Sequence, residues 1–323
     1  MRVLVSAGAA PANAAIVADA CIAAELDGIP SHGLARLPFY ADQVSSGKID
    51  GRALPEVRQT AAATVSVDAC HGFAFPAIAA GLAAAVPLAR SAGIAAVGVR
   101  NSHHCGVLGR HVEWLAERGL FALAFANTPA AMAPWGGVRP LFGTNPIAFA
   151  CPRQAAQPLV VDLSMSVAAR GKIMMAAGKN EPIPEGWALD EFGQPTTDAR
   201  AALRGTMMPV GGAKGVALAL VVELLCAALT QSQFGYEASS FFDASGPPPG
   251  IGQLFVMFDT DAFGSGTVLD RIEELCQAIS REAPARIPGE RRLAARAQAA
   301  IKGISLPKNL HDLLQARAEY PRK

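Results

Sequence analysis

The sequence predicts an α/β protein in which helices cover a β-sheet. Strand-like apolar segments alternate with Ala-rich helical segments through the first half of the chain. The segments at residues 94–99 and 120–126 are continuously apolar, as is typical of strands that are covered on both faces. Hydrophobic residues make up 51% of the 323 residues and charged residues 17%, which indicates a large folded core.

The N-terminal part is expected to be helical. One helix is predicted over residues 13–26, where apolar residues recur with helical periodicity. Asp27-Gly28-Ile29-Pro30 interrupts this pattern, and Ser31 is expected to cap a second helix that ends near Gly47. A Pro- and Gly-containing linker follows at residues 51–55.

The remaining elements follow from β-branched content, Ala-rich runs and glycine stops. A long excursion at residues 179–212 is expected to carry function, because long irregular segments in a compact fold usually do. The predicted strands are 64–67, 94–99, 120–126, 147–150, 159–161 and 254–258, and the predicted helices are 76–90, 107–118, 164–177, 214–229, 268–279 and parts of 286–323.

Composition disfavours several classes of protein. The formal net charge of +1 gives no reason to expect binding to nucleic acid or to an anionic membrane. No run of about twenty purely apolar residues is present, so no transmembrane helix is expected. The six cysteines are scattered without a CxxC pair, which favours free thiols in a reducing cytoplasm. No histidine or cysteine spacing resembles a zinc site, so no metal is expected.

His32, Arg36 and Tyr40 are spaced at intervals of four residues. On a helix they would share one face, although Pro38 makes this safest for His32 and Arg36. An imidazole, a guanidinium and a phenol are the groups that a small carboxylate undergoing proton transfer needs. The alternative is an interface helix that carries these residues by chance.

Three loops place small and polar residues directly after apolar strands or before an apolar helix. Residues 101–106 include His103-His104, residues 162–166 follow a strand, and residues 211–215 include Lys214. Free backbone N–H groups and a lysine in such turns can bind a phosphate, although each loop alone is equally well an ordinary turn. The sequence contains no GxGxxG after its first strand, no GxxxxGK[ST] and no GxSxG, which disfavours a Rossmann domain, a phosphate loop and a serine hydrolase.

Taken together, the motifs resemble those of the malate/L-lactate dehydrogenase family of NAD(P)-dependent oxidoreductases, which is unrelated to the Rossmann-type enzymes. The resemblance covers nearly the whole chain, in the expected order. The motifs are Asp27-Gly28-Ile29-Pro30-Ser31-His32-Gly33 with Arg36 and Tyr40, Asn101-Ser102-His103-His104-Cys105-Gly106, Gly143-Thr144-Asn145-Pro146-Ile147-Ala148-Phe149, Val161-Asp162-Leu163-Ser164, Ala169-Arg170-Gly171-Lys172, Gly212-Ala213-Lys214-Gly215 before Glu223, and Pro288-Gly289-Glu290-Arg291.

The resemblance implies a non-Rossmann α/β fold with a mainly antiparallel cofactor-binding sheet flanked by helices. It also implies a helical part built from both chain ends, residues 1–58 with residues 280–323, beside an NAD(P)- and substrate-binding part at residues 59–279. Members of the family are typically homodimers. They bind NAD or NADP and a small carboxylate substrate.

The resemblance also assigns roles to individual residues. His32 resembles the proton donor, with Ser31 as its hydrogen-bond partner, and His104 is the competing candidate for the acid/base. The substrate-binding positions are Arg36, Tyr40, Thr144, Arg170 and Gly171. The cofactor-binding positions are His104, Cys105, Gly106, Val107, Leu108, Asp162, Leu163, Ser164, Lys214, Gly215, Gly289, Glu290 and Arg291.

The expected reaction is hydride transfer between a nicotinamide and the carbon next to a carboxylate, which interconverts 2-oxo and 2-hydroxy acids. The alternative is reduction of the cyclic imines Δ1-pyrroline- or Δ1-piperideine-2-carboxylate to L-proline or L-pipecolate. Phe241-Phe242 is similar to the imine-reductase branch, whereas Lys172 differs from the acidic residue found there in some members. A third alternative is a non-catalytic ligand-binding relative. The choice between NADH and NADPH stays open.

Overall fold

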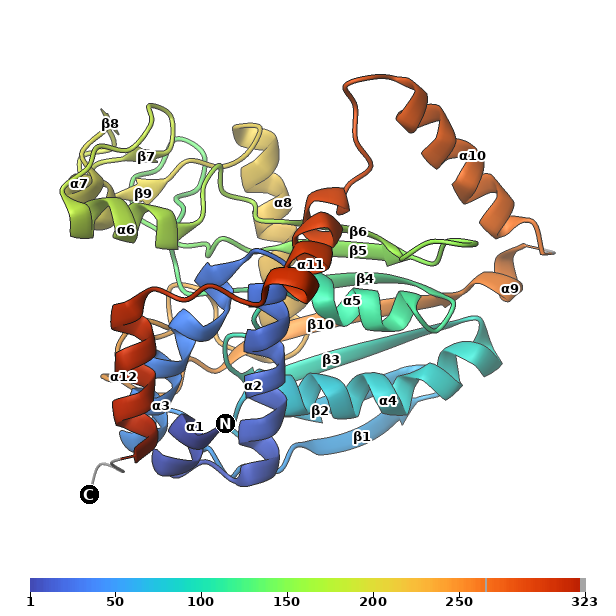
Figure 1. Cartoon of the computed structure of the whole chain (residues 1–323), viewed down its shortest axis with the longest axis horizontal. Helices are drawn as coiled ribbons and strands as arrows, with labels where there is room; N and C mark the ends of the chain where they lie inside the picture. The colour runs from blue at the N-terminus through green and yellow to red at the C-terminus, as the bar shows by residue number, and fades with distance from the viewer. Residues whose placement is uncertain (265, 320–323) are drawn as a thin grey trace.

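A seven-stranded sheet forms the centre of the computed structural model, which describes residues 1–264 and 266–319 (Figure 1). Among the strands described, five of the six neighbouring pairs are antiparallel and only β2 and β3 are parallel. The predicted mainly antiparallel sheet is confirmed. In spatial order the strands are β1 (Glu56–Ala61), β2 (Thr64–Asp68), β3 (Ile94–Ser102), β10 (Ile251–Asp259), β4 (Leu120–Ala126), β5 (Ile147–Cys151) and β6 (Leu159–Leu163).

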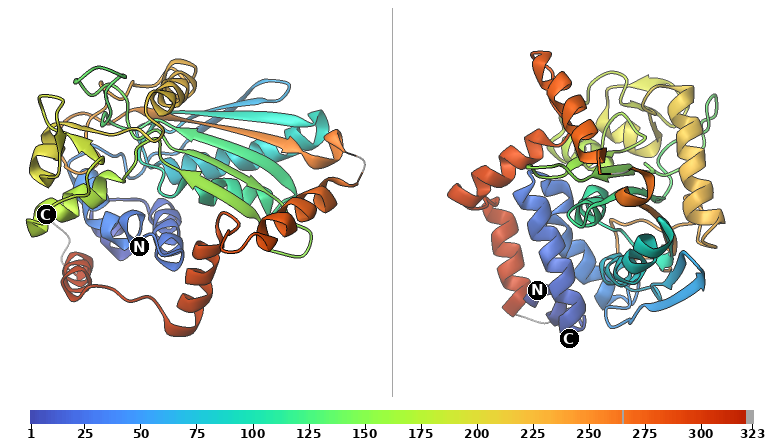
Figure 2. Two further views of the ribbon diagram at one scale, coloured as in Figure 1. Left: turned by 90° about the horizontal axis from the view of Figure 1, so that it is seen from above. Right: turned by 90° about the vertical axis from the view of Figure 1, so that its right-hand side faces the viewer.

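Helices cover both faces of this sheet, as the apolar strands predict. The helices α4 (Ala74–Ala92) and α5 (Leu108–Ala116) bury their apolar residues against one face. On the other face, α8 (Ala213–Glu223) continues into a π-helical turn (Leu224–Ala228) that packs against β10 and β4 (Figure 2). By length and composition α4 is apolar enough to cross a membrane, but half of it is buried inside the protein.

The two chain ends pack together beside the sheet (Figure 1). Leu314 and Ala318 of the C-terminal helix contact the apolar cluster that contains Val3, Leu4 and Tyr40. A further pair of helices, α9 (Thr260–Phe263) and α10 (Val268–Arg281), lies at the far end of the sheet. The division of the chain near residue 58 stays a prediction. The helices at the chain ends are α1 (Arg2–Ser6), α2 (Pro11–Leu26), α3 (Leu37–Ser45), α11 (Glu290–Lys302) and α12 (Lys308–Glu319).

The excursion predicted at residues 179–212 is a small lobe with its own apolar core. It contains a three-stranded sheet in the order β8 (Pro195–Thr196), β7 (Ala188–Leu189) and β9 (Thr206–Met207). The helices α6 (Arg170–Lys179) and α7 (Ala199–Arg204) pack against it. This lobe brings the N-terminal end of α6 toward the sheet.

The prediction that one helix begins at Ser31 is wrong. Two short 3-10 turns, Pro30–His32 and Leu34–Arg36, precede α3, which begins at Leu37. The Ser31 hydroxyl bonds to Nδ1 of its neighbour His32 and does not cap a helix. Pro38 lies in the first turn of α3, where its missing N–H leaves no bond unmade.

Two further boundaries differ from the prediction. The helix predicted at residues 164–177 begins only at Arg170, because Ser166 forms a β-bridge with Pro209 and so holds the preceding segment extended. Strand β1 was not predicted. All six of its residues are exposed, so no alternation of apolar and polar residues reveals it.

Candidate active site

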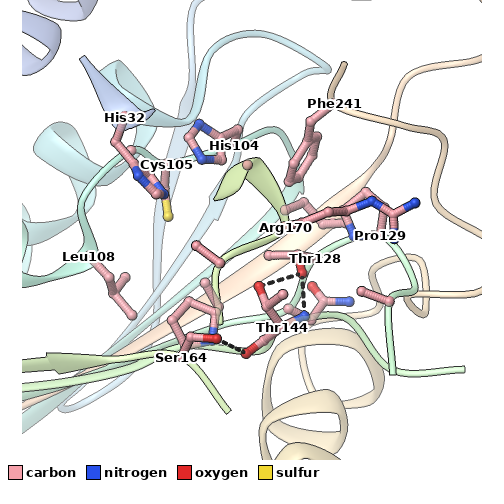
Figure 3. A pocket seen from close by; sticks show the side chains of 18 of the residues that line it. His32, His104, Cys105, Leu108, Thr128, Pro129, Thr144, Ser164, Arg170 and Phe241 are labelled. Carbon is pink, nitrogen blue, oxygen red and sulfur yellow. Dashed lines mark hydrogen bonds between the residues drawn. The ribbon is translucent and has the colours of Figure 1, made fainter. Parts of the chain in front are cut away.

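A cavity of about 500 Å³ opens where the N-terminal turns, the small lobe and the ends of several strands meet (Figure 3). His32 and His104 lie together at one side of it, next to Phe241. Thr144 and Ser164 lie across the cavity from the histidines in this view. The cavity therefore joins residues from four distant parts of the chain.

The two histidines form a stacked pair with different partners. Their ring centroids are 5.3 Å apart. Nδ1 of His32 is 3.0 Å from the Ser31 hydroxyl, and Nδ1 of His104 is 2.6 Å from the Tyr40 hydroxyl. Burial raises the pKa of Tyr40 well above its usual value, so this phenol stays protonated in its hydrogen bond with His104. When the phenol is the donor, neutral His104 carries its own proton on Nε2.

Both imidazoles are neutral in the free protein at neutral pH. Burial, and after it the positive charge of Arg36, lowers the pKa of His32 to about 4. The same two causes, with His32 and His103 added, hold the pKa of His104 well below its usual value. A bound anion that cancels the charge of Arg36 would raise both pKa values.

Arg36 is the buried cation of the site. Its Nε donates to the Ser31 carbonyl at 2.9 Å, and its Cζ lies 4.5 Å from the ring centroid of Phe242. Within residues 1–264 and 266–319 no carboxylate forms a salt bridge with it, and its buried Nη1 has no hydrogen-bond partner. Because a guanidinium stays charged even when buried, this side chain is ready to bind an anion from the cavity.

A second arginine lines the same cavity. Arg170 is the first residue of α6 and is half-buried, and within the described part of the chain its guanidinium makes only a long hydrogen bond, from Nη2 to the Leu203 carbonyl at 3.4 Å. Its neighbour Gly171 also lines the cavity, and a Cβ there would lie 3.9 Å from Cβ of Ser31. The N-terminal end of α6 thus places a second cation within the pocket that holds His32.

Thr144 lines the cavity on a loop that Glu223 holds in place. The buried carboxylate of Glu223 accepts hydrogen bonds from Asn145 Nδ2 at 2.7 Å, from Asn127 Nδ2 at 3.1 Å and from the Gly235 N–H at 2.6 Å. Three loops that line the cavity therefore meet on one side chain of α8. The Thr144 N–H donates to the Thr128 hydroxyl at 2.9 Å, which orders the adjacent wall.

The turn before α5 and the end of β6 form a further part of the cavity wall, which runs from beside the histidines to Ser164. All the residues predicted here as cofactor contacts, Cys105–Leu108 and Asp162–Ser164, line it. The Asp162 carboxylate accepts a hydrogen bond from the Gly109 N–H at 2.7 Å, and Leu163 leaves 45% of its surface exposed. A free carboxylate oxygen, backbone N–H groups and apolar surface suit the hydroxyls, phosphates and ring of a dinucleotide, so these residues fit NAD(P).

Other predicted site residues lie outside the cavity. Tyr40 lies behind His104 and reaches the site only through that ring. Lys214 is exposed on α8, and a Cβ at Gly215 would lie 1.8 Å from the Val210 carbonyl oxygen, which makes glycine necessary for packing there. Gly289 is the N-cap of α11 and has a φ of 93°. Glu290 and Arg291, which follow it, are exposed. Lys172 also lies outside the lining, and its Nζ is 5.8 Å from the Trp187 ring.

Sequence reasoning did not assign site roles to two segments that line the cavity, residues 127–131 and 235–242. The first segment could have been found from Asn127-Thr128, two polar residues directly after the apolar strand β4. The second, with Phe241 and Phe242, follows α8 and contains no regular structure among its described residues, so periodicity could not mark it.

Comparison with known proteins agrees with this geometry. A family model described as malate/L-lactate dehydrogenase matches residues 1–315. The (2R)-3-sulfolactate dehydrogenase (NADP(+)) of Chromohalobacter salexigens is 53% identical over 95% of this chain and 91% of its own length. The Δ1-pyrroline-2-carboxylate/Δ1-piperideine-2-carboxylate reductase of Pseudomonas syringae pv. tomato is 41% identical over 99% of this chain and 93% of its own.

Solved structures give the same result. The crystal structure of Δ1-piperideine-2-carboxylate reductase from Pseudomonas syringae has a TM-score of 0.92 and 40% identity, and the match covers 98% of this chain and 96% of that one. Sulfolactate dehydrogenase from Methanocaldococcus jannaschii has a TM-score of 0.89 and 31% identity, with 98% and 93% covered. The chain therefore belongs to the malate/L-lactate dehydrogenase family.

Proposed function

We propose that this protein is an NAD(P)-dependent oxidoreductase that interconverts a 2-oxo acid and the corresponding 2-hydroxy acid. The observation that carries the proposal is the buried Arg36, which has a free Nη1 and no carboxylate partner within the described residues, beside two neutral histidines. A guanidinium in this state binds the carboxylate of a substrate, and an adjacent imidazole exchanges a proton with the oxygen at C2.

In this mechanism the nicotinamide cofactor supplies or accepts the hydride when it is bound. Arg36 holds the carboxylate of the substrate and fixes the orientation of its C2 atom. During reduction, Nε2 of His32 donates a proton to the C2 oxygen, and during oxidation it takes that proton back. Ser31 orients the ring through Nδ1. In the tautomer protonated at Nε2, His104 offers a further hydrogen bond to the same oxygen.

Binding of the substrate carboxylate also makes His32 easier to protonate. The positive charge of Arg36 is one of the two causes that lower the pKa of His32, so its neutralisation raises that pKa toward the working range. Substrate binding and protonation of His32 are therefore favourable to one another.

Arg170 favours a substrate with a second anionic group. It is a half-buried cation of the same cavity, and its one hydrogen bond to the described residues is long. A 2-oxo acid that carries a sulfonate or a second carboxylate at C3 would use both arginines, whereas a cyclic imine carboxylate would use only one. The relative with 53% identity is named for sulfolactate.

The test is an initial-rate assay with NADH and NADPH in parallel, using sulfopyruvate, oxaloacetate, pyruvate and the two cyclic imines. We expect the dianionic 2-oxo acids to give the highest kcat/KM, and Arg170→Met to remove their advantage over pyruvate. Equal kcat/KM for pyruvate and the dianions would contradict the role of Arg170. No turnover of any substrate would contradict the proposed activity.

Reduction of cyclic imines is the second candidate. Phe241 and Phe242 form an apolar wall of the cavity that suits a saturated ring, and the reductase from Pseudomonas syringae is 41% identical. Turnover restricted to the two imines would establish this activity and reject the oxo-acid proposal.

The cofactor contacts remain proposals. We propose that Cys105–Leu108 and Asp162–Ser164 hold the cofactor, with Lys214, Gly215 and Gly289–Arg291 as outer contacts. Alanine substitution at Lys214 or Arg291 is expected to weaken binding of NADH or NADPH, measured by quenching of protein fluorescence. Unchanged affinity would remove that residue from the cofactor site.

We also propose that the protein is a cytoplasmic homodimer. Apolar side chains along α8 and its π-helical continuation are exposed, and burial against a second copy would remove them from water. A mass near twice 33.4 kDa by light scattering would support the dimer. All six cysteines are free thiols, which fits a reducing compartment. The exposed apolar residues of α8 and the segment that follows it are Leu218, Leu220, Val221, Leu224 and Leu229.

A further inference from the structure

The aromatic wall of the cavity is carried by a loop that has no regular structure of its own. The described residues 239–246 form no helix or strand, yet Phe241 is only 5% exposed. The Phe241 ring centroid lies 5.3 Å from that of His104 (Figure 3), and the Phe242 ring faces the guanidinium of Arg36 at 4.5 Å. A loop without a hydrogen-bonded ladder needs another means to hold two rings in these positions.

Lys48 holds this loop in place through hydrogen bonds to its backbone. Its side chain is 1% exposed, and its Nζ donates to the carbonyls of Ser240 at 2.7 Å, Asp243 at 3.1 Å and Ser245 at 2.7 Å. Nζ also lies 3.5 Å from Oδ1 of Asp243. All three ammonium hydrogens therefore have a carbonyl partner on one loop, as a buried lysine requires.

Gln43 holds the same loop from the helix. Its buried side chain donates through Nε2 to the carbonyls of Phe241 at 2.9 Å and Asp243 at 3.0 Å. Gln43 belongs to α3, and Lys48 follows the end of that helix by three residues. The same helix carries Tyr40, which bonds to His104. One short segment thus positions both a histidine of the site and the wall behind it.

We propose that Lys48 and Gln43 are positioning residues for substrate binding, because they hold the loop that seats Phe242 on Arg36 and Phe241 on His104. The inference rests on the proposed function and adds two residues to it. Both act through the loop, since neither lines the cavity.

The expected consequence is specific to the substrate. With Phe242 over one face, Arg36 is shielded from water, and its attraction for a carboxylate is strengthened. If the loop moves away, water reaches the guanidinium and the carboxylate binds more weakly. The turn Cys105–Leu108 has no hydrogen bond to the loop, so the affinity for the cofactor is expected to be unaffected.

The test uses Lys48→Met and Gln43→Met, which keep much of the side-chain length but remove the donors. For the best substrate, we expect Lys48→Met to raise KM about tenfold, the effect of losing about 1.4 kcal/mol of binding, while kcat changes less than threefold. The dissociation constant of the reduced cofactor should change less than twofold. Lys302→Met is the matched control, because Lys302 is exposed on α11 and does not line the cavity. A folded variant with unchanged KM would overturn the proposal.

A second readout does not depend on turnover. Released from its anchors, the loop should show faster amide hydrogen exchange over residues 239–246 and faster chymotrypsin cleavage after Phe241 or Phe242. If no substrate is turned over by the wild type, the proposed function fails, but loop release still tests the anchoring. Exchange as slow as in the wild type in both variants would overturn the anchoring, whatever the activity. Gln43→Met keeps Lys48 in place, so it provides a milder variant if Lys48→Met does not fold.

Discussion

Two half-buried arginines and one buried arginine differ in what balances their charge. Arg292 and Arg296 of α11 contact the carboxylates of Asp27 and Glu113, at distances from 2.7 to 3.3 Å. Arg36 has no such partner within residues 1–264 and 266–319, although it is only 7% exposed. The charges of Arg292 and Arg296 are balanced inside the fold, whereas the charge of Arg36 is available to a ligand.

The difference separates structure from function. The paired cluster joins α11 to α2 and α5, and so attaches the C-terminal end to the body. Burial alone would raise the pKa of Glu113, but the hydrogen bonds from Arg292 and Arg296 outweigh it and lower that pKa to about 2. Burial, and after it the charge of Arg36, instead lowers the pKa of the neighbouring His32, and a bound carboxylate relieves the part that is due to Arg36. An unpaired buried charge therefore marks the functional site.

The largest effect is expected at the acid beside the unpaired arginine. His32→Ala should lower kcat by about 10²- to 10⁴-fold, the usual contribution of a positioned general acid, while cofactor affinity is retained. Steady-state kinetics and fluorescence titration with NADH and NADPH measure both quantities. His311→Ala is the control, because His311 is exposed on α12 and, among the residues that the structure describes, its ring pairs with Asp312 alone.

The same experiment decides between the two histidines. If His32→Ala leaves kcat unchanged and His104→Ala abolishes it, the proton transfer belongs to His104. Loss in both variants would indicate that the stacked pair works as a unit, because removal of either ring also changes the environment of the other.

The next effect is expected in the paired cluster, and on stability. Glu113→Gln removes the carboxylate that four guanidinium N–H groups share and leaves two arginines with one acid. Breaking a buried ion cluster costs about 3–5 kcal/mol, so the urea midpoint should fall clearly while the substrate KM of the remaining folded protein stays unchanged.

A matched surface pair calibrates this result. Arg271 and Glu274 form an exposed i, i+3 ion pair on α10, and Glu274→Gln should cost less than about 1 kcal/mol. A Glu113→Gln variant as stable as Glu274→Gln would mean that the cluster is not what attaches α11, and the comparison would fail.

At the unpaired site the arginine itself should affect binding more than stability. Arg36→Lys keeps a positive charge but loses the planar fork, and we expect the substrate KM to rise about 10- to 100-fold, equivalent to one or two charge-assisted hydrogen bonds. Thermal unfolding should change little, because no carboxylate within the described residues loses a partner. Wild-type kinetics in this variant would place the carboxylate elsewhere in the cavity, with Arg170 as the next candidate.

The sequence predicted most of the sheet because its strands are apolar on both faces. Strand β4 at Leu120–Ala126 was predicted with its observed bounds. The antiparallel order, however, came from the family resemblance, since local patterns carry no information on which strands pair. The turns around Gly33 were missed for a similar reason. The Leu34 N–H bonds to the carboxylate of Glu25, a contact between helices that spacing cannot reveal.

The site shows the same limit. Residues near one another in the chain, such as Ser31, His32 and Arg36, could be found from their chemistry, and the structure brings them to one cavity. Glu223 and the loop at residues 239–246 act through hydrogen bonds to distant segments. No local sequence pattern marks these residues, and their role becomes visible only from the tertiary contacts.

The last prediction concerns pH and is the finest test of the unpaired charge. Reduction needs protonated His32, whose pKa is about 4 in the free protein. Since kcat/KM reports the free enzyme, kcat/KM for reduction should fall as pH rises above about 4. In the complex, the carboxylate cancels Arg36, so the fall in kcat should occur at least about one pH unit higher. The groups that face His32 are Ser31, Arg36 and His104.

Oxidation provides the internal control, because it needs neutral His32. Its kcat/KM should rise with pH through the same free-enzyme pKa and then level off. Coincident midpoints in kcat and kcat/KM for reduction would show that the substrate carboxylate does not cancel the charge beside His32. Arg36 would then be a buried cation that the fold tolerates, and the contrast with the paired cluster of Asp27 and Glu113 would lose its functional meaning.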